Sequence, residues 1–140
     1  MGPVNDLAPI LQIFLKGSSG HIAIVSSLYG HCGLPGAAAY AATKAALINM
    51  CEALKHELER SGIKLNLINR GFVGTPLTEK SDFPMPFLMS TKDTAIRIMR
   101  GLEKPACEIT FSRRLAFLIK LLRVLLDRLF LIVTRRMLRE

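Results

Sequence analysis

The 140-residue sequence has no tryptophan, only three cysteines and no long hydrophobic run. Cys32, Cys51 and Cys107 are odd in number and lack the Cys-x2-Cys spacing of zinc sites, which argues against a disulfide framework and against a zinc site. We expect small buried thiols in a reducing compartment. A spanning helix needs about 18 consecutive apolar residues, and no such run occurs, so we expect a chain that does not span a membrane.

We also recognise no secretory leader, no internal repeat and no low-complexity tract in the sequence. The first apolar stretch is interrupted by Asp6 and Pro9 and has no basic leader, so we expect a cytoplasmic protein. Half of the residues are apolar and 21% are charged, which excludes the disordered class and indicates one globular domain. The three histidines have no metal-ligand spacing, and we expect no bound metal.

The positive charge is concentrated at one end of the sequence. The formal net charge is +8, and residues 111–140 hold eight of the 19 Lys and Arg residues against two acids. The remaining 110 residues are therefore nearly neutral. The basic character belongs to a C-terminal segment and not to the body of the protein.

Apolar periodicity and glycine or proline boundaries predict three helices alternating with three strands. The glycine-bounded run 21–27 predicts a strand buried on both faces. Ser90, with Asp93 three residues later, predicts a helix N-cap. The helices are expected over residues 4–16, 37–60 and 90–103, and the strands over residues 21–27, 63–68 and 108–111.

This order predicts the α/β class, with a doubly wound parallel sheet that has helices on its faces. Three strands make a narrow sheet, and a first strand this apolar should lie between two neighbours. Nothing before residue 21 predicts such a neighbour. We therefore expect the sheet to be completed by a second copy or a complementing chain, or the sequence to be the second half of a larger fold.

Ser27, Tyr40 and Lys44 form the candidate catalytic group. Tyr40 and Lys44 are four residues apart on a predicted helix, so their side chains share a face. An ammonium beside a phenol stabilises the phenolate, which a phenolic acid/base requires. Ser27 follows a buried strand at the carboxyl end, where open parallel sheets bind ligands, and its hydroxyl could hold a substrate oxygen.

Two segments resemble the short-chain dehydrogenase/reductase family. The run IVSSLYGHCGLPGAAAYAATKAAL, with Ser27 thirteen residues before Tyr40, is similar to the catalytic segment of that family. The run INRGFVGTPLT, residues 68–78, is similar to the loop after the sixth strand of the family. The resemblance covers residues 1–111. It implies the carboxyl-terminal half of a dinucleotide-binding domain, followed by a basic helical extension over residues 112–140.

The resemblance also implies roles for individual residues. Tyr40 would be the general acid/base that interconverts a carbonyl and an alcohol, Lys44 would hold the nicotinamide ribose, and Ser27 would orient the reacting oxygen. Hydride transfer would use NAD(H) or NADP(H). The loop residues implied in cofactor binding, besides Tyr40 and Lys44, are Gly71, Val73 and Thr75.

The sequence departs from the family pattern in its pyrophosphate site. No Gly-x-Gly-x-x-Gly turn occurs, and the residue that selects NAD or NADP is absent as well. Arg70 replaces the usual proline of the loop, and Gly74 stands where an acid is common. A partial Rossmann-like sheet without its N-terminal half is implied, and we expect a truncated chain with impaired activity, or none, on its own.

Residues 76–90 would form the flap over a small-molecule substrate. The apolar side chains Phe83, Met85, Phe87, Leu88 and Met89 indicate an apolar ligand, or else they pack on the body.

From Arg113 onward, apolar residues recur at helical spacing with Arg and Lys on the other side, which predicts a basic amphipathic helix. Such a helix can lie on an anionic membrane surface, giving peripheral membrane contact, or it can pack on the body or on a second subunit. Nucleic acid is not expected, because the apolar stripe lacks interleaved aromatics and the body is nearly neutral. The second functional hypothesis is therefore a non-catalytic module that binds a membrane or a partner through residues 112–140.

Overall fold

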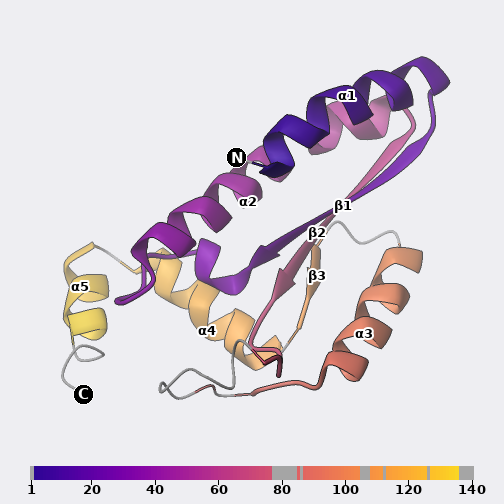
Figure 1. Ribbon diagram of the computed structural model, residues 1–140. Coiled ribbons are helices and arrows are strands. Elements are labelled where there is room, and N and C mark those ends of the chain that lie inside the picture. Colours follow the sequence, from indigo (N-terminus) through magenta and orange to yellow (C-terminus); the bar gives the residue numbers. More distant parts are fainter. Residues whose placement is uncertain are drawn as a thin grey trace.

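A computed structural model of the chain describes residues 2–76, 85, 87–104, 108–111, 113–125 and 127–135. Helices and strands alternate along the chain (Figure 1). In chain order the elements are α1 (Gly2–Gly17), β1 (Gly20–Ser27), the short 3-10 helix η1 (Leu28–Gly30), α2 (Ala38–Arg60), β2 (Ile63–Arg70), α3 (Thr91–Glu103), β3 (Glu108–Thr110), α4 (Arg113–Val124) and α5 (Asp127–Arg135).

The three strands form one parallel sheet in the order β1-β2-β3. β1 pairs with β2 over its whole length, from Gly20 opposite Ile63 to Ser27 opposite Arg70. β3 is short and pairs with the last part of β2, with Ile109 opposite Ile68. The α/β class and the parallel sheet predicted from the sequence are confirmed.

The helices cover the two faces of the sheet unequally. α1 and α2 lie together over one face (Figure 1), where the apolar residues of β1 and β2 pack against Leu7 of α1 and Leu47 of α2. α3 covers the opposite face only over β2 and β3. There Ile68, Ile109 and Phe111 are buried against Ile98 and Leu102.

β1 was predicted to be buried on both faces, and that prediction is wrong. Ile22 and Ile24 are buried under the helices, whereas His21, Ala23 and Val25 are exposed on the other face. β1 is an edge strand, and α3 packs over its neighbours and not over β1 itself. The apolar run that resembles a central strand thus presents one open face and one open edge.

The helix boundaries follow local signals in the sequence. The backbone N–H of Asp93 donates to the Ser90 hydroxyl at 3.0 Å, which confirms the predicted N-cap of α3. After α2, Gly62 adopts a left-handed conformation with φ 74°, which a residue with a side chain rarely adopts. The turn then leads directly into β2.

The C-terminal segment forms two helices where the sequence pattern predicted one. α4 ends at Val124 and α5 begins at Asp127. α4 packs across the carboxyl end of the sheet, where Leu115, Ala116 and Ile119 contact Leu28 of η1. Part of the apolar stripe therefore packs on the body, as one of the two alternatives expected. Among the described helices, none is long and apolar enough to cross a bilayer.

Candidate active site

Ser27 lies at the carboxyl edge of the parallel sheet, as the sequence predicted. It is the last residue of β1 and is 6% exposed. Its hydroxyl accepts a hydrogen bond from the backbone N–H of Tyr29 at 3.3 Å and donates a long one to the carbonyl of Arg70 at 3.5 Å. The hydroxyl thus caps η1 and ties the end of β1 to the end of β2.

Tyr40 and Lys44 lie together on the first turns of α2. The Lys44 ammonium is 5.7 Å from the centre of the Tyr40 ring, and the Tyr40 side chain is 41% exposed. The same ammonium donates a hydrogen bond to the carbonyl oxygen of Val25 at 3.2 Å. An ammonium carries three N–H donors, so this bond leaves two for a ligand.

The end of β1 is held against α2 by a residue that the sequence analysis did not single out. The Ser26 hydroxyl is fully buried and donates to the carbonyl of Lys44 at 2.9 Å. Gly30 lies so close to α2 that a Cβ there would be 2.7 Å from the backbone carbon of Lys44. A signal existed in the sequence, since strand alternation places Ser26 on the same face as Ile22 and Ile24.

Tyr29 is a second phenol beside Tyr40. Burial raises its pKa above the ordinary value, and the nearby ionisable groups of Cys32 and Tyr40 raise it further. Its ring packs edge-on against Phe72, with the ring centres 5.7 Å apart. Tyr29 is therefore a packed, protonated phenol near neutral pH.

The loop after β2 is held next to η1. Val73 is buried and forms a parallel bridge with Met89, and the N–H of Gly74 donates to the carbonyl of Met89 at 2.8 Å. A Cβ on Gly71 would lie 3.8 Å from Leu28, the residue after Ser27. The loop that carries Gly71, Val73 and Thr75 thus borders the end of β1.

The predicted flap over residues 76–90 is described only in part. Residues 77–84 and 86, including Phe83, lie outside the described residues. Phe87 and Leu88 are about half exposed, whereas Met85 and Met89 are partly buried. Met89 packs against the cluster of Ile68 and Ile109, so at least this member of the apolar set contacts the body.

A polar network lies beneath the carboxyl end of the sheet. The Asn69 amide donates to Glu108 Oε1 at 2.9 Å and lies 3.2 Å from His31 Nε2, and the Lys120 ammonium donates to Glu108 Oε2 at 2.6 Å. His31, then Lys120, Asn69 and Thr110, hold the pKa of the Glu108 carboxyl well below its usual range. The network links η1, β2, β3 and α4.

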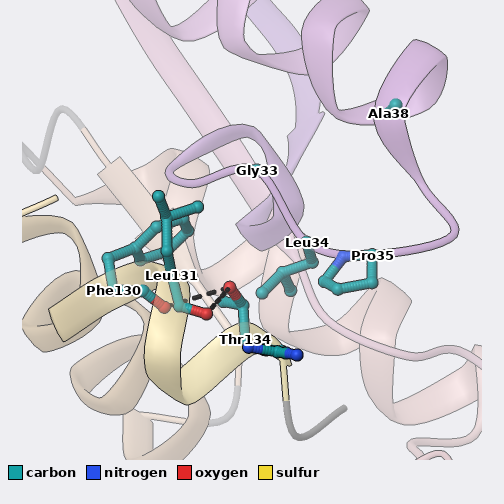
Figure 2. A pocket seen from close by; sticks show the side chains of 8 residues that line it. Gly33, Leu34, Pro35, Ala38, Phe130, Leu131 and Thr134 are labelled. Atoms are coloured by element: carbon teal, nitrogen blue, oxygen red, sulfur yellow. Dashed lines mark hydrogen bonds between the residues drawn. The ribbon is translucent and has the colours of Figure 1, made fainter. Parts of the chain in front are cut away.

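An open pocket of about 580 Å³ lies between the segment that leads into α2 and helix α5 (Figure 2). Its lining is mostly apolar, with Leu34 and Pro35 on one side and Phe130 and Leu131 on the other. Arg135 also lines it. Within the described part of the chain, no group of three or more His, Cys, Asp or Glu residues could hold a metal ion.

Comparison with known proteins gives a consistent family. The family model described as short chain dehydrogenase matches residues 1–84. An uncharacterized oxidoreductase of Myxococcus xanthus is 37% identical over 136 residues, which cover 97% of this chain and 54% of the relative. The 3-oxoacyl-[acyl-carrier-protein] reductase FabG of Thermotoga maritima is 38% identical over 79 residues, covering 56% of this chain and 32% of the reductase.

Solved structures share the fold. A short chain dehydrogenase from Burkholderia cenocepacia in complex with NADP matches with a TM-score of 0.69 and 23% identity, over 90% of this chain and 50% of that one. A 7beta-hydroxysteroid dehydrogenase matches with a TM-score of 0.75 and 20% identity, over 94% of this chain and 54% of that one. The chain spans about half the length, or less, of the curated relatives described here.

Proposed function

The chain belongs to the short-chain dehydrogenase family, and from this membership we propose that residues 1–111 provide the catalytic half of a nicotinamide-dependent oxidoreductase that interconverts a carbonyl and an alcohol. One observation carries the proposal. The Lys44 ammonium lies 5.7 Å from the centre of the Tyr40 ring on the first turns of α2. The hydrogen bond of Ser26 to the Lys44 carbonyl holds the end of β1, which carries Ser27, against the same turns.

The proposed roles use the groups that this geometry leaves available. Tyr40, which is 41% exposed, gives the proton of its hydroxyl to the carbonyl oxygen in reduction and takes it back in oxidation. Ser27 orients that oxygen by turning its O–H away from the Arg70 carbonyl, to which its bond is long. Lys44 uses its two remaining N–H donors for the ribose hydroxyls of the cofactor. The bound nicotinamide supplies or accepts the hydride.

The cofactor is proposed to be NAD(H) or NADP(H). The described residues offer polar groups for its nicotinamide end, namely Lys44, Tyr40 and the loop of Gly71, Val73 and Thr75. The sequence holds no glycine-rich turn for the pyrophosphate. The dehydrogenases of Burkholderia cenocepacia and Sphingobium yanoikuyae were solved with NADP and NADPH, which supports the nicotinamide dinucleotide but not a preference for this chain.

The substrate is proposed to be a small apolar carbonyl compound or alcohol. Phe87 and Leu88 are exposed immediately before Met89, which is bridged to Val73 of the cofactor loop. Apolar side chains at that place would contact a substrate bound beside the nicotinamide.

A second copy or a complementing chain is proposed to complete the sheet. β1 has an open edge, and His21, Ala23 and Val25 are exposed on its uncovered face. An edge strand with a bare face readily pairs with another strand. Activity is therefore expected to depend on the oligomeric state.

The test is a fluorescence titration of the purified 140-residue chain with NADH and with NADPH, with its oligomeric state measured in parallel. Saturable binding supports the proposal, and a screen of apolar ketones and alcohols follows. No binding by a folded sample counts against catalysis. It favours the second candidate, a non-catalytic module, for which the exposed apolar side chains of α4 and α5 argue.

A further inference from the structure

Helix α4 is apolar on two opposite faces. Leu115, Ala116, Ile119 and Leu122 are buried, and the first three pack on η1. At about 100° per residue, Phe117, Leu121 and Val124 project from the other side of the helix. They are 71%, 51% and 81% exposed. A contiguous exposed apolar face marks a site of interaction, so the outward face of α4 calls for a second contact.

The outward face is bordered by positive charge. At about 100° per residue, Arg114 and Lys120 lie at its two edges. Arg114 is exposed and has no ion-pair partner among the described residues, whereas Lys120 is paired with Glu108. Residues 113–135 contain six Lys and Arg residues and a single acid, Asp127. α5 adds exposed Leu129, Leu131 and Ile132, each at least half exposed.

We propose that the outward face of α4 binds the surface of an anionic lipid bilayer. Phe117, Leu121 and Val124 enter the boundary between headgroups and acyl chains, while Arg114 at the edge of this face meets lipid phosphates or carboxylates. The long Arg stem lets the charged end remain in water as the apolar residues insert. This role is separate from hydride transfer and needs neither substrate nor cofactor.

Charge favours a bilayer over a second copy of the chain. In a two-fold symmetric dimer the same patch meets itself, so the positively charged segments 113–135 of the two copies would be brought together. Like charges at such short range oppose association. An anionic lipid surface compensates them instead.

The test is co-sedimentation of the full chain with vesicles of phosphatidylcholine alone and of phosphatidylcholine mixed equally with phosphatidylserine. The proposal expects binding to the anionic vesicles, much weaker binding to the neutral ones, and weakening by salt. The double variant Phe117→Gln, Leu121→Gln should bind the anionic vesicles at least about tenfold more weakly, since two inserted side chains are removed.

The matched control is Ile13→Gln, because Ile13 is 67% exposed and belongs to α1, a helix that lies away from α4 and α5 (Figure 1). It should bind lipid as the unchanged chain does. Circular dichroism checks that each variant is folded, and Val124→Gln replaces the double variant if that one unfolds. The proposal is overturned by equal binding to both vesicle types, by no binding, or by an equal loss in the control. Self-association that the face variants abolish, without lipid binding, would assign the face to a second copy.

Discussion

The ammonium nitrogen of Lys44 lies 5.7 Å from the centre of the Tyr40 ring and 3.2 Å from the carbonyl oxygen of Val25. The first distance is within the range of about 6 Å over which a cation is attracted to an aromatic face. Lys44 is thus held between the ring and the end of β1. A side chain that is already ordered loses less entropy when a ligand binds, so this arrangement suits the role proposed for Lys44 in holding the ribose.

Replacing Tyr40 by phenylalanine tests the proposed proton donor directly. Turnover shown by the chain, alone or with a complementing chain, should fall by at least about a hundredfold, because acid/base catalysis contributes that much or more. Tyr40 is 41% exposed, so the fold should be unaffected. NADPH affinity should fall far less than turnover, because the variant removes only one of the polar groups proposed for the nicotinamide end. Steady-state oxidation of NADPH and a fluorescence titration measure the two quantities.

Tyr29→Phe is the matched control, since Tyr29 is the only other tyrosine in the sequence. Its phenol has a raised pKa and packs against Phe72, so it should not exchange protons near neutral pH. Turnover should be retained. A larger loss of turnover in Tyr29→Phe than in Tyr40→Phe would mean that Tyr29, and not Tyr40, is the acid/base.

Replacing the adjacent serines Ser26 and Ser27 by alanine should affect different properties, stability in the first case and turnover in the second. Ser26→Ala removes a buried hydrogen bond to Lys44 and should lower the free energy of unfolding by about 1 kcal/mol. Ser27→Ala should lower turnover clearly. It should change the free energy of unfolding less than Ser26→Ala does, because the bond of Ser27 to Arg70 is long. Urea unfolding and initial rates on the two variants separate these effects. Equal losses of stability and of initial rate in the two variants would contradict the separate roles given to Ser26 and Ser27.

Local sequence signals were sufficient for the elements that build the site. Apolar periodicity with glycine boundaries predicted α2, the glycine-bounded apolar run predicted β1, and Ser90 predicted the start of α3. The four-residue spacing of Tyr40 and Lys44 predicted their shared face, which the structure shows. Each of these features depends on residues that are near each other in the sequence.

Long-range features could not be predicted in the same way. The exposed face of Val25 depends on where α3 packs, and the network of His31, Asn69 and Glu108 joins residues about 40 positions apart. The outward apolar face of α4 was hidden because periodicity cannot distinguish a helix with two apolar faces from one with a broad stripe. Such contacts arise only from tertiary packing.

Glu108 predicts how stability depends on pH. Its pKa in the folded state is well below the value of an unfolded glutamate, chiefly through His31 and then Lys120. A carboxyl with a depressed folded pKa contributes stability above its unfolded pKa and loses that contribution as pH falls. The free energy of unfolding should therefore decrease on acidification below about pH 5, as unfolded glutamates begin to bind protons.

In Glu108→Gln, stability at neutral pH should be lower and its decrease on acidification smaller. Urea unfolding at neutral pH and near pH 4 measures both effects. Glu103→Gln is the control, because Glu103 is exposed at the end of α3 and is not part of the network. Parallel pH dependences of the unchanged chain and Glu108→Gln would show that this carboxyl does not couple stability to pH.

Gly30→Ala should disturb both stability and the site, because the added Cβ meets backbone atoms that cannot rotate away. It would lie 2.7 Å from the Lys44 carbonyl carbon and 2.9 Å from the Ala45 nitrogen. Relief requires η1 to move from α2, at a cost of about 1–3 kcal/mol. That movement would draw Ser27 away from the helix that carries Tyr40.

Gly33→Ala is the control. Its added Cβ meets nothing within 4 Å, so the unfolding midpoint of this variant should be unchanged. Equal midpoints for the two variants would mean that η1 and α2 are not closely packed.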